Sequence, residues 1–130
     1  MSKALRWLSG VLHGEGRDTE AEPLVRRALA IDEAALGASP VTAMDLNGMA
    51  DLLWQQKHYA EAEPFARRAL AIRESTLGPE HPETAASVNN LAAVLKAQGR
   101  YADAEPFYRR ARDPREDAGA RTSGHRGEFE

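Results

Sequence analysis

The sequence has no cysteine, and it is poor in aromatic residues, in long apolar runs and in net charge. Without cysteine, disulfides, thiolate catalysis and cysteine metal sites are excluded, and a cytoplasmic protein is the default expectation. A net charge of −3 gives no electrostatic reason to expect nucleic acid as a partner. No run approaches the roughly 20 apolar residues needed to span a membrane, and Arg6 interrupts the run that a secretion signal would need. We therefore expect no membrane partner.

The most informative pattern that is present is a repeat. The tripeptide Ala-Glu-Pro starts at Ala21, Ala62 and Ala104, at intervals of 41 and 42 residues. The phrases that begin at Ala21 and Ala62 agree at 12 of 17 aligned positions. A fixed period of this length is typical of stacked-repeat proteins. Such solenoids present extended surfaces, which favours binding over chemistry.

Each repeat unit predicts two antiparallel helices joined by a tight turn. In the second unit, Ser39-Pro40 is a typical helix start. An apolar stripe at helical spacing follows, from Leu46 to Leu53. Lys57-His58 forms the turn, and a second helix runs from Tyr59 until Leu77-Gly78-Pro79 ends it. The third unit repeats this pattern from His81-Pro82, and the first unit follows it more weakly.

Arginine pairs also recur in each unit. Arg26, Arg67 and Arg109 each follow a glutamate by four residues, which is the favourable orientation for helical ion pairs. This spacing predicts a solvated outer face and not a basic binding stripe.

These patterns resemble the tetratricopeptide repeat family, in the longer variety with a period of about 42 residues seen in kinesin light chains and many bacterial arrays. The phrases VNNLAAVLKAQGRYADAEPFYRRA and LGPEHPETA are close to the family's typical wording. The resemblance covers about residues 4–112 and implies an all-α fold, a right-handed solenoid of three antiparallel helical hairpins. The residues that match the family's large and small positions are Leu91, Ala92, Leu95, Ala104, Tyr108 and Ala111.

The repeat register divides the chain into four parts. Residues 1–38 form repeat 1 with a partial first helix, 39–79 form repeat 2, 80–113 form repeat 3 with a truncated second helix, and 114–130 form a disordered tail. Pro114 should end the last helix, because proline removes a donor and clashes with the preceding turn. With no seventh helix to cover them, part of the stripe of Val88, Leu95 and Phe107 should be exposed. Self-association through the C-terminal end is therefore expected, or marginal stability if the chain stays monomeric.

The resemblance also implies that the first helix of each hairpin lines a concave groove that binds a peptide or partner protein. Trp54 is a candidate anchor, since interface hot spots favour tryptophan, but it could instead pack against the neighbouring repeat. Asn47 and Asn89 could bond an extended peptide with an acidic or apolar anchor, or only hold the stack together. The candidate groove residues are Arg6, His13, Asn47, Asp51, Trp54, Gln55, Asn89 and Lys96.

No arrangement of residues favours catalysis. The four histidines lack His-x-x-x-His spacing, and there is no Gly-x-Ser-x-Gly phrase. We therefore expect a non-enzymatic interaction module with no cofactor and no metal. Two alternatives remain open. One is a regulatory array of a larger protein that carries a nucleotide-binding or caspase-like protease domain, and the other is an assembly module that associates through the open ends of the solenoid.

Overall fold

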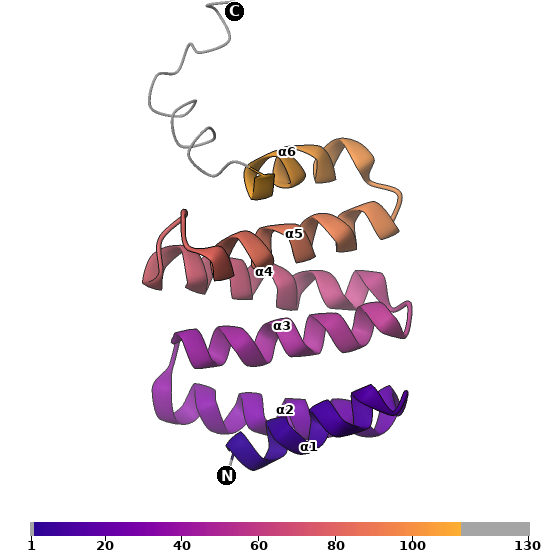
Figure 1. Ribbon diagram of the computed structural model, residues 1–130, viewed down its shortest axis with the longest axis vertical. Helices are drawn as coiled ribbons and strands as arrows, with labels where there is room; N and C mark the ends of the chain where they lie inside the picture. The colour runs from indigo at the N-terminus through magenta and orange to yellow at the C-terminus, as the bar shows by residue number, and fades with distance from the viewer. Residues whose placement is uncertain (1, 113–130) are drawn as a thin grey trace, which may run out of the picture.

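The computed structural model describes residues 2–112, which form a stack of six helices with no strand among them (Figure 1). Helices adjacent in sequence contact each other, and the stack runs from α1 at one end to α6 at the other. This confirms the predicted all-α solenoid of three antiparallel hairpins, while the tail predicted at 114–130 lies outside the described residues. The helices are α1 (Ser2–Gly14), α2 (Asp18–Leu36), α3 (Pro40–Gln55), α4 (Tyr59–Thr76), α5 (Pro82–Ala97) and α6 (Tyr101–Arg112).

The first helices of repeats 2 and 3 begin at capped prolines, as predicted. The Ser39 hydroxyl accepts the backbone N–H of Thr42 at 3.2 Å, and His81 Nδ1 accepts that of Glu83 at 3.0 Å. Each cap satisfies a donor that would otherwise lack a partner, and proline fits the first helical position because its missing N–H is not needed there. His81 therefore has a structural role.

The turn inside each hairpin uses the same backbone geometry. The equivalent positions Gly16, Lys57 and Gly99 all have positive φ, at 77°, 67° and 80°. Glycine adopts this conformation without steric cost, whereas Lys57 is disfavoured in it. The tight turns keep the two helices of each hairpin antiparallel, so that equivalent residues of successive repeats stack above one another.

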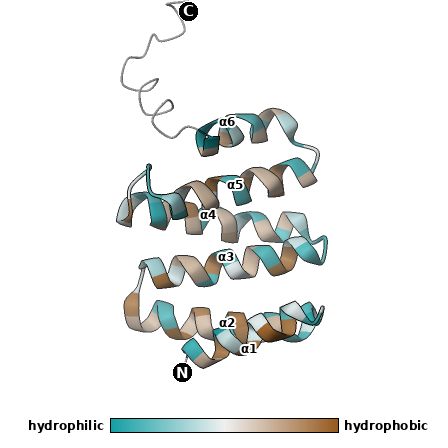
Figure 2. Ribbon diagram, viewed as in Figure 1, coloured by the Kyte–Doolittle hydropathy of each residue, from teal (hydrophilic) through white to brown (hydrophobic). Residues whose placement is uncertain are grey.

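The core consists of the predicted helical stripes. Ala21, Ala62 and Ala104 are all buried, which allows the helices of each hairpin to approach closely. The larger side chains that fill the interior with almost no exposure include Leu46, Met49, Leu53, Leu91 and Leu95. Figure 2 shows hydrophobic and hydrophilic residues interspersed along each helix, which is the pattern of helices with one buried side.

The prediction that part of the C-terminal stripe is exposed holds for Phe107 and not for Val88 or Leu95. Val88 and Leu95 are only 2% and 0% exposed, whereas Phe107 is partly buried. The reason is that α5 packs between α4 and α6, so its apolar stripe faces the interior and not the open end. Among residues 2–112, the C-terminal end of the stack is formed by other residues of α5 and α6.

The predicted ion pairs on the second helices are confirmed. Glu22–Arg26, Glu63–Arg67 and Glu105–Arg109 form at 2.9, 2.8 and 3.3 Å. Further ion pairs join these outer helices from one repeat to the next, Arg68 with Glu33 and Arg110 with Glu74. The arginines therefore stabilise the outer side of the stack and do not form a basic binding stripe.

Candidate functional site

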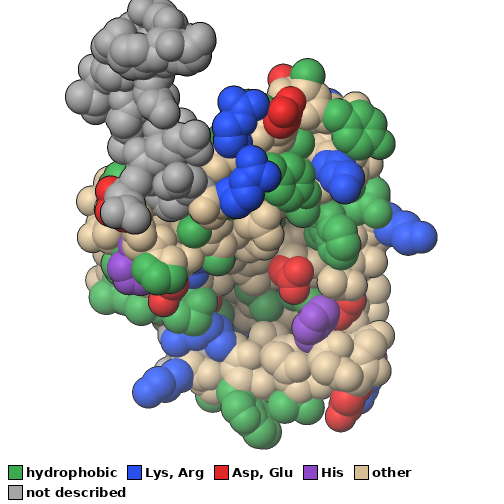
Figure 3. Space-filling model, turned by 45° about the horizontal axis from the view of Figure 1, so that its top comes forward, with side chains coloured by type: hydrophobic (Ala, Val, Ile, Leu, Met, Phe, Trp, Pro, Cys, Tyr) green, Lys and Arg blue, Asp and Glu red, His purple; other side chains and the backbone are tan. Residues whose placement is uncertain are grey.

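The helices α1, α3 and α5 place equivalent residues in rows across three repeats. One row contains His13, Trp54 and Lys96, and the next contains Gly10, Asp51 and Ala93, at spacings of 41 and 42 residues. A third row contains Arg6, Asn47 and Asn89. These rows include all but one of the predicted groove residues. Figure 3 shows acidic side chains beside a histidine in a hollow of the molecular surface.

Trp54 and Asp51 lie at a cavity between α3 and α5. This α3–α5 cavity has a volume of about 130 Å³, and Asp51 is the only charged residue among those that line it. Trp54 is 37% exposed, and its ring lies 6.2 Å from that of Tyr59 in an edge-to-face arrangement. Trp54 thus packs against Tyr59 of its own hairpin, and part of it remains exposed at the α3–α5 cavity. The lining residues are Ala50, Asp51, Trp54, Asn90, Ala93 and Val94.

Asp51 also borders a second cavity, between α1 and α3. His13 lines this α1–α3 cavity, and its Nδ1–H donates to the Asp18 carboxylate at 2.6 Å. The His13 Nε2 atom lies 3.8 Å from the Asp51 carboxylate. The hydrogen bond to Asp18 raises the pKa of His13, burial opposes this, and the negative charges of Asp18 and Asp51 add to the rise. Asp18, which sequence reasoning did not select, therefore holds His13 beside Asp51.

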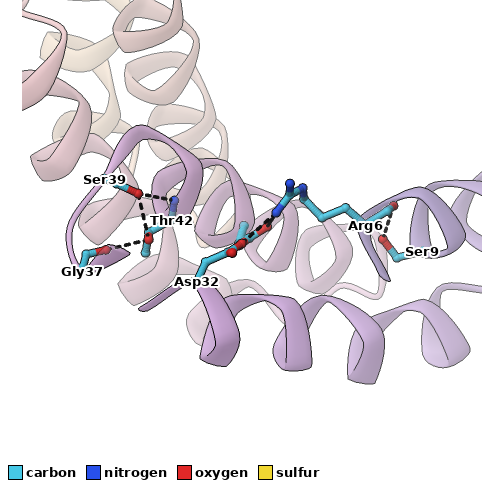
Figure 4. Close-up of polar contacts among 7 residues, drawn as sticks. Arg6, Ser9, Asp32, Gly37, Ser39 and Thr42 are labelled. Atoms are coloured by element: carbon cyan, nitrogen blue, oxygen red, sulfur yellow. Dashed lines mark hydrogen bonds and ion pairs between the residues drawn. The ribbon is translucent and has the colours of Figure 1, made fainter. Parts of the chain in front are cut away.

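Arg6 lies in an ion cluster between the first two repeats. Its guanidinium donates to Asp32 of α2 at 2.7 Å and to Asp45 of α3 at 3.4 Å (Figure 4). Both carboxylates are buried. Burial, followed by the hydrogen bond and the charge of Asp32, raises the pKa of Asp45 to about 7, while Arg6 opposes the rise. Arg6 therefore joins repeats 1 and 2 through its bonds to Asp32 and Asp45.

Asn47 also joins two repeats. Its amide donates to Ser87 of α5 at 3.0 Å, and Arg73 of α4 donates to the same hydroxyl at 2.9 Å. Asn47, Arg73 and Ser87 occupy the positions equivalent to Arg6, Asp32 and Asp45. A polar cluster with one cationic side chain thus occurs at both junctions between repeats. The cation is Arg6 of α1 between repeats 1 and 2, and Arg73 of α4 between repeats 2 and 3. Of the two interpretations of Asn47, the structure supports the one in which it holds the stack.

The remaining predicted residues do not gather at one place. Asn89 and Lys96 line an open depression between α5 and α6, together with Tyr108 and Arg112. Gln55 is exposed and is not among the residues that line these three cavities. The predicted set therefore separates into a central part, with His13, Asp51 and Trp54, and a C-terminal part, with Asn89 and Lys96.

The described helices offer little for other chemistry. Within residues 2–112, no group of three or more His, Asp or Glu side chains could hold a metal ion. None of the six helices carries an apolar stretch of the length needed to cross a bilayer.

Comparison with known proteins agrees with this geometry. The family model for the tetratricopeptide repeat matches residues 1–75 and 46–117, whereas no curated protein matches the chain. The crystal structure of BtubC (BKLC) from P. vanneervenii is similar with a TM-score of 0.82 and 26% identity, over 91% of this chain and 48% of that one. A Podosopora anserina protein with nearly identical TPR-like repeats, described as a kinesin light chain, has a TM-score of 0.76 and 24% identity, over 84% of this chain and 52% of that one.

This chain therefore spans about half the length of the solved structures that it resembles. The matched family model covers more than half of the sequence, and the structural neighbours share its stacked hairpins. The chain belongs to the tetratricopeptide repeat family, and its repeats are of the kinesin-light-chain-like kind.

Proposed function

We propose that this chain is a non-enzymatic interaction module that binds an extended peptide or a partner protein along the face formed by α1, α3 and α5. The observation that carries the proposal is the pair of cavities between these helices, which share Asp51 and place the accessible Trp54 beside it. An aromatic anchor at the centre of a lined depression is typical of interface hot spots. A peptide laid across the helices would pass from His13 to Trp54.

The packing of the stack supports a concave shape on this side. The helices α3 and α5 contact each other directly. On the opposite side, by contrast, long side chains connect the second helices, as in the pairs Arg68–Glu33 and Arg110–Glu74. Closer approach of the first helices would curve the stack toward them, which fits a groove that follows α1, α3 and α5.

Replacing Trp54 with alanine should weaken partner binding by at least roughly 2 kcal/mol, because a central tryptophan anchor would be lost. The partner is first captured from a lysate with the full chain, and its affinity is then measured by calorimetry. Trp7→Ala is the matched control, since Trp7 is an exposed tryptophan of α1 that lines neither cavity. Equal affinities for the parent and Trp54→Ala would move the binding site off this face.

A second candidate function is assembly of two copies of the chain through the C-terminal end. The positions equivalent to Tyr108 are Val25 and Ala66, both of which are buried. Val25 packs closely against Gly48 of the next repeat, whereas Tyr108 is only partly buried and lines the α5–α6 depression. Among the described residues this end therefore presents the face on which the other repeats stack.

Introducing a charge at this face should prevent such assembly. If two copies associate there, Tyr108→Glu should lower the apparent mass measured by light scattering across a concentration series, because a carboxylate would have to be desolvated at the contact. Tyr101→Glu is the control, as Tyr101 is an exposed tyrosine at the start of α6. A parent chain that stays monomeric at high concentration contradicts the proposal.

Three finer expectations remain proposals. The absence of enzymatic activity and the cytoplasmic location rest on composition and on family resemblance. A regulatory role beside a nucleotide-binding or caspase-like protease domain rests on resemblance to bacterial arrays of this family. A chain with any of these three properties could still bind a peptide.

A further inference from the structure

The lining of the α3–α5 cavity carries charge of only one sign, and this limits the chemistry of the partner group that the cavity can bind. Asp51 is the only charged residue in its lining. The equivalent residues above and below Asp51 in the stack are Gly10, which has no side chain, and Ala93, which has only a methyl group. Asp51 is 57% exposed at its side chain. The centre of the proposed groove is thus a single accessible negative charge.

The protein itself balances this charge only weakly. Within residues 2–112, His13 is the one cationic side chain in an ion pair with Asp51, at 3.8 Å, and its other ring nitrogen is already bonded to Asp18. An acidic anchor of the partner would need Lys96 as its counter-charge, but Lys96 lines the α5–α6 depression and not this cavity. When His13 is neutral, Asp51 therefore has no counter-charge in contact with it among the described residues.

Trp54 adds a second element of cation recognition. It lies three residues after Asp51, so both side chains are on one side of α3. The contact with Tyr59 helps to fix the orientation of its ring. A carboxylate beside an indole ring attracts a cation through both charge and the ring quadrupole.

The size of the cavity selects a single side chain. Its volume of about 130 Å³ is below the roughly 300–1,000 Å³ typical of small-molecule sites. The end of one lysine or arginine side chain would fit, with its stem against Ala93 and Val94. We propose that the α3–α5 cavity binds the cationic side chain of a lysine or arginine in an extended partner segment. This inference rests on the proposed function of the same face.

The test uses the full chain labelled with ¹⁵N and capped peptides of glycine and serine with one central residue: lysine, arginine, norleucine or glutamate. Low ionic strength limits screening, and the pH is set above the His13 titration, which the same spectra report. Lysine and arginine peptides should shift the Trp54 indole and the Asn90 amide signals in a saturable way, whereas norleucine and glutamate peptides should not. Asp51→Asn should weaken lysine-peptide binding about tenfold or more, since a charge-assisted contact is lost.

Glu61→Gln removes an exposed carboxylate of α4 and should leave the peptide affinity unchanged. The inference is overturned if norleucine or glutamate peptides bind as well as lysine peptides, if Asp51→Asn has no effect, or if no peptide shifts these signals. It is also overturned if free butylamine binds as well as the lysine peptide, because the site would then recognise small amines. A glutamate peptide that binds at Trp54 would leave the proposed function intact, whereas a partner insensitive to Trp54→Ala would overturn that function separately.

Discussion

At about pH 8, Arg6→Met should be less stable than the parent chain by about 3 kcal/mol. Removing one partner from a buried ion cluster leaves uncompensated charge, which costs roughly 3–5 kcal/mol, and the partial exposure of Arg6 places the expected loss at the lower end. Methionine keeps the apolar stem and removes only the guanidinium. Without that group, Asp32 and Asp45 would face each other across α2 and α3 with no cation between them.

The loss of stability caused by Arg6→Met should be smaller at low pH than at high pH. Asp45 has its pKa raised to about 7 in the folded chain, from an ordinary value of 3.8. Between these values the folded chain binds more protons than the unfolded chain, so this group lowers stability as pH rises. At about pH 5, Asp45 is protonated in both variants, and the loss should shrink to the roughly 1–2 kcal/mol of a hydrogen bond from Arg6 to Asp32.

Urea unfolding at the two pH values measures both effects, and hydrogen exchange shows whether they concentrate in α1 and α2. Lys3→Met is the matched control, because it removes an exposed cation of the same helix. The contribution of His13 is common to the variants and cancels when each is compared with the parent at the same pH. Equal losses at both pH values would contradict the assigned role of Asp45.

Leu95→Glu should unfold the C-terminal repeat. Leu95 is fully buried between helices, so the substitution removes a core side chain, at a cost of roughly 2–5 kcal/mol, and places a carboxylate in an apolar site, at a cost of several more. The sum is comparable to the roughly 5–15 kcal/mol of a whole domain. Circular dichroism should therefore show lost helix at room temperature and a lower melting temperature.

Two controls separate core disruption from a surface effect. Leu95→Met conserves volume and should cost less than roughly 1.5 kcal/mol. Tyr101→Glu adds the same charge at an exposed position of α6 and should melt close to the parent. If Leu95→Glu instead melted like Tyr101→Glu, α5 would not pack as described.

The fold could be predicted because the same pattern of a helical hairpin occurs three times in the sequence. Each copy of the Ala-Glu-Pro phrase fixes a buried alanine at the same helical position, and capping residues such as Ser39 and His81 mark where the helices begin. The exposure predicted for the C-terminal stripe applies to Phe107 and not to its other two members, although position in the sequence suggested an open end. The packing of α5 between α4 and α6 instead buries Val88 and Leu95.

The site was predicted less well, because side-chain partners come from distant parts of the chain. Arg6 and Asn47 were placed in the groove, but their partners Asp32 and Ser87 lie 26 and 40 residues away. A signal was available at Asp45 and Ser87, which are polar residues at equivalent positions beside apolar stripes. By contrast, the exposure of Trp54 and Asp51 could be predicted from one helix, because it depends only on the face of α3 that carries them.

The stacking of neighbouring hairpins also governs how the chain folds and opens. The hydrogen bonds from Arg6 to Asp32 and from Asn47 to Ser87 close loops of only 26 and 40 residues, so folding can start in any hairpin and spread to the next. The hairpin of α3 and α4 has a described neighbour on both sides, whereas those at the ends have one. The end hairpins should therefore open first, and a ligand that spans α1, α3 and α5 would slow their opening by joining them to the middle.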